Sequence, residues 1–324
     1  MVYGQYLYSM KLGPLHLLIF LASCTSSHTE IHGDADPMPE TFLLVLGNVQ
    51  DAGSPQAGCM KECCRDLWTH PDSSRMVSSL ALIHTPEEAA WFFDATPDFS
   101  KQWALAQSQV LFKVNPSAIF LTHGHIGHYT GLMYMGKEAK NSKNVPVYAF
   151  PRMTDFLQKN APWEALINNR NVQLNTLNES SSVSLSDYIS VRSVLVPHRD
   201  EYSETAGFII QGPTNSALFI PDIDKWERWE INIDSLISVV DYAFIDGTFY
   251  DGNELPNRDI KTIPHPFISE SMERFKGMSP ELRDRIYFIH LNHTNPALDP
   301  ESSASTEIEK AGFHVARTGM KVGM

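Results

Sequence analysis

Three histidines lie within six residues of one another, in a segment that could bind metal ions. They are His123, His125 and His128. They follow the apolar run 117–121 and precede residues 129–135, so the sequence predicts a turn between a buried strand and a helix. Neutral imidazole is a common ligand of zinc and related ions, and His123 and His125 could bind one ion. His128 would then face a second ion. A solvated histidine-rich turn is the ordinary alternative, but three of the thirteen histidines in one turn argue against it.

Two further candidate ligands follow predicted buried strands later in the chain. His198 follows the run 189–196, and we expect it to be the third ligand of the ion held by His123 and His125. Asp222 follows the run 216–220, and its carboxylate could bridge two ions and take part in catalysis. Its ordinary alternative is a helix cap, a role that suits Asp224 better.

The last predicted core strand, 285–289, runs directly into His290. We expect His290 to bind the second ion together with His128 and Asp222. His293, three positions later, is expected to be a reserve ligand or a catalytic proton donor to the leaving group. His265, between two prolines, is expected either to line the substrate pocket or to hold a loop.

Asp94 closes the second strand of a predicted hairpin, 76–85 and 89–95. A carboxylate at that place could brace the histidine turn by accepting hydrogen bonds, which would orient its ligands. The alternative is an aspartate that only starts a turn.

Three cysteines, Cys59, Cys63 and Cys64, follow a loop over 48–58. In an oxidising compartment a disulfide would be the ordinary expectation, but adjacent cysteines pair poorly and three leave one unpaired. The alternative is a small structural zinc site whose fourth ligand is His70 or a distant histidine. Both remain open at the level of sequence.

The predicted elements that position these residues follow two patterns of secondary structure. Strands and helices alternate in the first half, and runs typical of antiparallel strands follow from residue 172. The main predicted strands are 41–47, 145–150, 172–177, 182–185, 207–211 and 242–245, and the main predicted helices are 99–107, the segment from 129, the segment from 151, and 304–311. This pattern predicts a layered α/β fold with a cleft along one edge of its sheets.

The composition indicates a globular protein without a basic surface. With 324 residues, of which 43% are hydrophobic, the chain can bury a large core. The net charge of -13 and the scattered Lys and Arg residues exclude a surface for nucleic acid.

The first residues predict a targeting segment. Lys11 precedes a short apolar run, 15–20, and the segment 21–24 ends in Cys24 and resembles a bacterial lipobox. We therefore expect a signal peptide at 1–23, a lipid anchor on Cys24, a tether over 24–40 and a folded domain over 41–324. The protein would be exported and anchored to a bacterial membrane, facing the periplasm. The alternative is an ordinary cleaved signal peptide in which Cys24 is incidental.

These motifs, in this order along the chain, resemble those of the metallo-β-lactamase superfamily. The resemblance runs from about Phe42 to the end of the chain and is carried by Asp94, His123, His125, His128, His198, Asp222 and His290. It implies an αβ/βα sandwich, two mixed sheets with helices on the outer faces. Within the superfamily the chain is most similar to the pyrroloquinoline quinone (PQQ) biosynthesis protein B group, on the segments 47–56, 245–250 and 290–299.

One position departs from the superfamily pattern His-x-His-x-Asp-His, because Gly127 stands where the aspartate should be. We expect the missing carboxylate to weaken binding of the second ion or to change the metal. On this reasoning Gly127→Asp should raise both the affinity for the second ion and the rate.

The sequence thus predicts an exported metal-dependent hydrolase with one or two zinc ions, or iron or manganese in their place. A metal-bound hydroxide would attack a small acyl substrate (lactam, ester or thioester) or a phosphoryl substrate. Two alternatives are an iron or zinc redox enzyme like the PQQ biosynthesis protein B group, and a metal-binding lipoprotein without catalysis. The expected partners are a small-molecule substrate and, through Cys24, a membrane.

Overall fold

The structure is a computed structural model that describes residues 39–179, 182–256 and 258–324. The predicted signal peptide 1–23, Cys24 and the tether as far as residue 38 lie outside these residues. Within the described residues, the helices are all too short or too polar to cross a bilayer.

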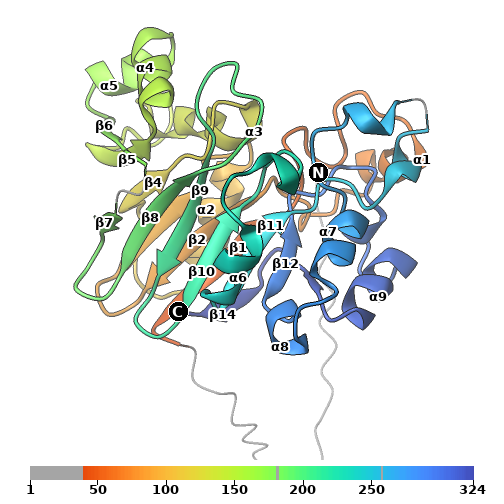
Figure 1. The fold of residues 1–324 in the computed structure, drawn as a ribbon. Helices are drawn as coiled ribbons and strands as arrows, with labels where there is room; N and C mark the ends of the chain where they lie inside the picture. The colour runs from red at the N-terminus through yellow and green to blue at the C-terminus, as the bar shows by residue number, and fades with distance from the viewer. Residues whose placement is uncertain (1–38, 180–181, 257) are drawn as a thin grey trace, which may run out of the picture. The chain divides into compact units, whose positions relative to one another are not determined.

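Two seven-stranded sheets form the centre of the fold (Figure 1). The first has the order β14-β1-β2-β3-β4-β5-β6, and the second β13-β12-β11-β10-β9-β8-β7. The strands of the first sheet are β14 Lys321–Gly323, β1 Thr41–Gly47, β2 Ser79–His84, β3 Ala89–Phe93, β4 Ala118–Phe120, β5 Val145–Ala149 and β6 Val172–Thr176. The strands of the second are β13 His314–Val315, β12 Ile286–Ile289, β11 Tyr242–Asp246, β10 Ser216–Ile220, β9 Ala206–Gln211, β8 Ser190–Leu195 and β7 Ser182–Ser184.

Each sheet is mixed. In the first, β1, β2 and β3 pair antiparallel, and β3 to β6 pair parallel. In the second, β7 to β10 pair antiparallel, and β10 to β13 pair parallel. The expectation that the antiparallel run starts at residue 172 was wrong, because β6 pairs parallel with β5 and closes the first sheet. Its short alternating run looks the same in either direction of pairing.

Successive side chains of a strand point to opposite faces, and this alternation separates three apolar layers. On β1, Leu43 and Val45 belong to the layer between the two sheets, whereas Phe42, Leu44 and Leu46 face the outer side of the first sheet. The middle layer is rich in aromatic rings from both sheets. Residues on both faces of these strands are therefore buried, as expected for sheets covered by helices.

Helices cover the two outer faces (Figure 1). The helices α2 Phe99–Ser108, α4 Pro151–Lys159 and α5 Trp163–Asn168 contribute buried side chains to the layer outside the first sheet. The helices α6 Ile233–Ser238, α7 Ile268–Phe275 and α9 Ser303–Lys310 do the same outside the second. The shorter helices are α1 Glu62–Arg65, α3 Ile126–Tyr129 and α8 Pro280–Arg283. The predicted αβ/βα sandwich is confirmed.

Candidate metal centre

Four side chains from three strand ends meet in a first cluster. His123 and His125 follow β4, His198 follows β8 and Asp222 follows β10. One ligand atom from each lies within 4.8 Å of the others. Oδ2 of Asp222 is 3.4 Å from Nε2 of His123 and 3.2 Å from Nε2 of His198. Two ligands of one zinc ion lie at most about 4 Å apart, because each is about 2.1 Å from the metal. The side chains therefore converge as ligands of one cation do.

A second cluster shares the same carboxylate. It consists of Asp51, His128, Asp222 and His290, again with ligand atoms within 4.8 Å of one another. Oδ1 of Asp51 is 2.9 Å from Nε2 of His128 and 3.2 Å from Nε2 of His290. Oδ2 of Asp222 is 3.9 Å from the same nitrogen of His128 and 4.0 Å from that of His290. Asp222 therefore lies between the two clusters, where a bridging ligand would be.

The buried polar atoms of both clusters fit a cation. Nε2 of His128, Nε2 of His198 and Oδ1 of Asp222 are buried and have no partner with hydrogen-bond geometry among the described residues. Leaving buried polar atoms without partners is costly, so such atoms call for an explanation. A metal ion between the imidazoles and the carboxylates would satisfy them. Neutral nitrogens and carboxylate oxygens are a donor set for zinc, iron or manganese.

Asp94 holds the histidine turn in place. Its carboxylate accepts hydrogen bonds from the backbone N–H and the hydroxyl of Thr122, at 2.7 and 3.0 Å. It also lies 2.7 Å from Nδ1 of His128, which leaves Nε2 of that ring facing the second cluster. Asp94 is fully buried and has a left-handed φ of 68°. The strand end is thus shaped to place one carboxylate behind the turn.

A second buried aspartate, Asp246 at the end of β11, organises the other side of the centre. It accepts hydrogen bonds from the backbone N–H groups of Ile223 and Thr248, and it lies 2.9 Å from Nδ1 of His265. The same nitrogen of His265 is 3.2 Å from Oδ1 of Asp222. His265 therefore lies beside the shared carboxylate, in a fixed orientation.

Without an ion, the electrostatics of the protein chain favour the protonation state of a metal ligand at some of these residues and not at others. Burial and the neighbouring His128 hold the pKa of His123 well below its usual value, so this imidazole is neutral. Burial acts to raise the pKa of Asp222, but His198, His265 and His290 outweigh it and hold that pKa well below its usual value. Burial likewise acts to raise the pKa of Asp51, and His128 and His290 hold it low.

Burial acts to lower the pKa of His128, but Asp94 and Asp51 outweigh it and hold that pKa well above its usual value. Burial acts in the same direction on His198, but Asp222 outweighs it and raises the pKa to about 9, so a metal ion would displace a proton from each of these two rings.

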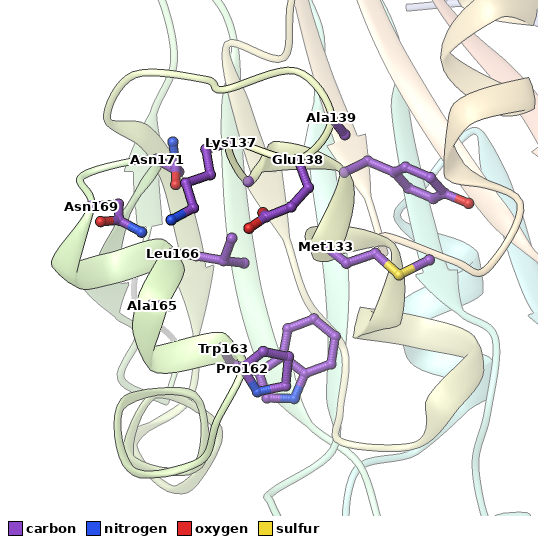
Figure 2. Close-up of a pocket in the computed structure, with 12 residues that line it drawn as sticks. Met133, Lys137, Glu138, Ala139, Pro162, Trp163, Ala165, Leu166, Asn169 and Asn171 are labelled. Atoms are coloured by element: carbon purple, nitrogen blue, oxygen red, sulfur yellow. The ribbon is translucent and has the colours of Figure 1, made fainter.

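Two pockets adjoin the clusters. One, of about 640 Å³, is lined by His265, Thr248, Asn292 and three arginines, Arg199, Arg228 and Arg258. The other, of about 430 Å³, is lined by Asp51, His125, Tyr129, Phe156, Arg199 and Tyr202. A third pocket, of about 470 Å³, contains none of the cluster residues. It lies between the 3₁₀ helix η2 Thr130–Met135 and α5, with Met133, Trp163 and Leu166 among its walls (Figure 2).

Comparison with known proteins gives a family for this geometry. The model of a family described as the beta-lactamase superfamily domain matches residues 91–291, which include every residue of the first cluster. The chain belongs to the metallo-β-lactamase superfamily.

Relatives in the superfamily extend over most of the chain. The coenzyme PQQ synthesis protein B of Xanthomonas oryzae pv. oryzae (strain MAFF 311018) is 24% identical over 305 residues, which is 87% of this chain and 99% of that protein. A Zn(2+)-bound PqqB from Methylobacterium extorquens has a similar fold, with a TM-score of 0.74 and 20% identity over 87% of this chain and all of that one. A diphosphatase of the PhnP family has a TM-score of 0.59, also with 20% identity, over 87% of this chain and 96% of that one.

The superfamily motif helps to interpret Gly127. A Cβ atom at this glycine would lie 2.3 Å from Oδ1 and 2.6 Å from Cα of Asp51. The expectation that the centre lacks a carboxylate was therefore wrong, because Asp51 fills the space above Gly127. The structure also gives no ground for expecting a gain from Gly127→Asp, because the new side chain would collide with Asp51.

His293 lies elsewhere than predicted, and it belongs to neither of the two clusters. A ring nitrogen of His293 and the sulfur atoms of Cys59, Cys63 and Cys64 lie within 4.8 Å of one another. His290 has a left-handed φ of 67°, and the next residue, Leu291, bonds to Asn48, so the chain turns toward the cysteine loop. The three cysteines are free, and three thiols with one imidazole are a donor set for structural zinc. His70, the other candidate, is outside this group.

Sequence reasoning gave no role in the site to Asp51, Asp246 or Thr248. Asp246 follows a buried strand, as Asp222 does, and that shared pattern was the available signal. Asp51 follows no strand directly and lies in a loop rich in glycine and proline. Only contacts with distant residues make it part of the site.

Proposed function

We propose that this protein is a metal-dependent hydrolase whose substrate is a small molecule with a phosphoryl group. The observation that carries the proposal is the pair of four-residue clusters that share Oδ2 of Asp222. Sites with two ions are a recurring solution for displacement at phosphorus, because both the attacking and the leaving oxygen can be stabilised.

The chain offers distinct ligands to each ion. His123, His125 and His198 would hold the first, and His128, His290 and Asp51 the second, with Asp222 between them. A bound zinc, iron or manganese ion would supply Lewis acidity and an acidified water. Asp94 keeps His128 oriented, since it lies at hydrogen-bonding distance from the ring nitrogen away from the cluster.

The arginine-lined pocket favours an anionic substrate over a neutral lactam or ester. Arg199 and Arg258 line it, and within the described part of the chain neither side chain forms an ion pair or a hydrogen bond. Arg228 is paired with Asp224 at 2.7 Å. Guanidinium groups bind phosphate oxygens with directed, charge-assisted hydrogen bonds. In a chain with a net charge of -13, this local concentration of arginine suits an anion.

His265 is better placed than His293 to give a proton to the leaving group. It lines the arginine pocket, and its Nδ1 faces both Asp246 and Asp222. This orientation leaves Nε2 as the nitrogen available for another partner. General acids act at hydrogen-bonding distance from the group they protonate, and His293 is held in the cysteine group instead.

The test compares hydrolysis of four chromogenic substrate classes by the zinc-loaded and manganese-loaded protein. The panel consists of bis(4-nitrophenyl) phosphate, 4-nitrophenyl phosphate, a chromogenic cephalosporin and a thioester. We expect phosphoryl hydrolysis, and His123→Ala should lower it about a thousandfold, since Lewis-acid stabilisation contributes several kcal/mol. His70→Ala, a change to an exposed histidine outside the clusters, is the control. A metal-loaded protein inactive on the whole panel would contradict the proposal.

A second candidate is a redox enzyme with iron in the first cluster. The curated relatives named coenzyme PQQ synthesis protein B favour it, because their similarity covers 87% of this chain. Metal analysis of protein purified under low oxygen separates the two candidates. Iron as the main metal, with oxygen consumption and no hydrolysis, would favour the redox enzyme. The non-catalytic alternative depended on a missing carboxylate, and Asp51 removes that ground.

We also propose that Cys59, Cys63, Cys64 and His293 bind a structural zinc ion, and that the protein is exported and anchored through Cys24. The first proposal is supported by the free thiols and by the distances within the group. The second is supported only by the sequence of the leader. Fractionation of cells that produce Cys24→Ser tests the anchor: the variant should leave the membrane fraction, and a retained membrane association would contradict it.

A further inference from the structure

Asp51 and Gly127 occupy one space. The nearest atoms to a Cβ built on Gly127 all belong to Asp51, and the closest, Oδ1, is 2.3 Å away. Real Cβ contacts are never this short, so the two residues cannot both carry side chains in the present arrangement. Gly127 itself is not among the described glycines with a left-handed φ, which are Gly53, Gly58, Gly312 and Gly319. The backbone therefore does not require glycine at position 127, but the space does.

We propose that Asp51 is a transposed ligand: it gives the second ion the carboxylate that the superfamily motif places at position 127. This inference rests on the two-ion centre proposed above and deepens it. The oxygen that fills the Gly127 space is the one that faces both histidines of the second cluster, at 2.9 and 3.2 Å. The carboxylate is thus supplied by a different part of the chain, and only glycine at position 127 leaves room for it.

The backbone before Asp51 is fixed to both sheets, which suits a residue that must hold a precise position. Val49 forms isolated bridges with Val77, just before β2, and with Leu291, just after β12. The N–H of Gln50 donates to Leu291 at 2.8 Å, and the N–H of Leu291 donates to Asn48 at 2.7 Å. Asp51 therefore leaves a short segment held between the sheets, and its side chain is mostly buried.

An ion pair alone accounts for less of the geometry. Asp51 could serve only to neutralise His128, which also has Asp94 on its other nitrogen. Yet Nε2 of His128 has no partner with hydrogen-bond geometry among the described residues, although Asp51 is 2.9 Å away. The ring of His128 and the carboxylate are therefore close without being aligned as a hydrogen-bonded pair, whereas Oδ1 of Asp51 does have hydrogen-bond geometry with Nε2 of His290, at 3.2 Å. A cation among Asp51, His128, Asp222 and His290 would give Nε2 of His128 the partner that it lacks.

The first test counts ions in Asp51→Asn, which keeps the size of the side chain and removes its charge. Mn²⁺ is the probe, because it prefers oxygen and nitrogen ligands to thiolates, and electron paramagnetic resonance measures the free ion during titration. We expect the full chain to bind two Mn²⁺ ions. In Asp51→Asn the first ion should bind as in the parent, and the affinity for the second ion should be at least about 100-fold weaker. Circular dichroism checks that the variant is folded.

The second test changes no ligand. Gly127→Ala should displace the Asp51 carboxylate and weaken the second Mn²⁺ about tenfold or more. The control is Gly124→Ala in the same turn, where the nearest atom to an added Cβ is 3.3 Å away. We expect this control to bind two ions like the parent. Gly127→Asp should also lose affinity for the second ion.

Two ions bound by Asp51→Asn with unchanged affinities would overturn the proposal and leave Asp51 as an ion-pair partner only. So would equal behaviour of Gly127→Ala and Gly124→Ala. These outcomes are independent of the proposed hydrolase, because they are measured without substrate. If His123→Ala loses hydrolysis while Asp51→Asn binds both Mn²⁺ ions with unchanged affinities, the proposed hydrolase stands and the proposal for Asp51 is contradicted.

Discussion

The two clusters that share Asp222 are built in different ways. All ligands of the first cluster follow regular strands, β4, β8 and β10, where hydrogen bonds to neighbouring strands fix the backbone. Half of the second comes from irregular backbone: Asp51 lies in a loop, and His290 has a left-handed φ of 67°. The positions of the ligands in the first cluster therefore depend on the sheets. Those in the second cluster also depend on the contacts that hold the loop of Asp51. Loss of a ligand should act differently in the two.

The largest effect should come from the first cluster. His198→Ala removes one of its three imidazoles and leaves all four residues of the second cluster in place. We expect at least about a 100-fold loss of affinity for one ion, more than the loss of an outer partner causes, and little remaining hydrolysis. Elemental analysis and the phosphodiester assay measure the two effects. The distinction between the clusters breaks down if His198→Ala loses both ions equally.

The cysteine group should affect the second cluster selectively. Asp51 lies on the loop that leads to Cys59, and His290 and His293 lie in one turn, so two of the four segments that supply the second cluster also enter the cysteine group. We expect Cys59→Ser to lose the structural zinc and to weaken the second Mn²⁺ by about tenfold, while the first is unchanged.

His70→Ala, the other histidine near the cysteines in sequence, is the matched control and should bind metal like the parent. Equal weakening of both Mn²⁺ ions in Cys59→Ser would indicate general loss of structure instead of a local link.

The same contrast explains what the sequence could predict. The ligands of the first cluster could be found because each follows a strand that alternation and apolar runs reveal. The layered α/β class followed from those strands, whereas the two mixed sheets were implied by the family resemblance, and the direction of β6 was predicted wrongly. Asp51 could not be found in this way, since only the hydrogen bonds from residues 48–50 to Leu291 and Met76 bring it to the centre. The place of His293 depends on the left-handed turn at His290, which local propensity does not predict for a histidine.

A smaller effect should come from the residue that braces the turn joining both clusters. Asp94→Asn keeps the size of the side chain and weakens its hydrogen bonds to Thr122 and His128. We expect affinity for the second ion to fall about tenfold, because His128 loses its oriented partner. The first ion should change less, since Asp94 reaches its ligand His123 only indirectly, through Thr122. Mn²⁺ titration distinguishes the two, and an unchanged second affinity would contradict this role.

The smallest effect should come from the arginine pocket, which lies beyond either cluster. Arg199 is exposed, so its removal should raise KM for the phosphodiester by about fivefold and leave kcat nearly unchanged, as exposed charge pairs contribute at most about 1 kcal/mol. Arg192→Ala, an exposed arginine on β8 outside the pocket, controls for net charge. Higher salt should reduce the difference between Arg199→Ala and the parent, because screening weakens an attraction that the variant already lacks. A fall in kcat with unchanged KM would instead place Arg199 in the reacting centre.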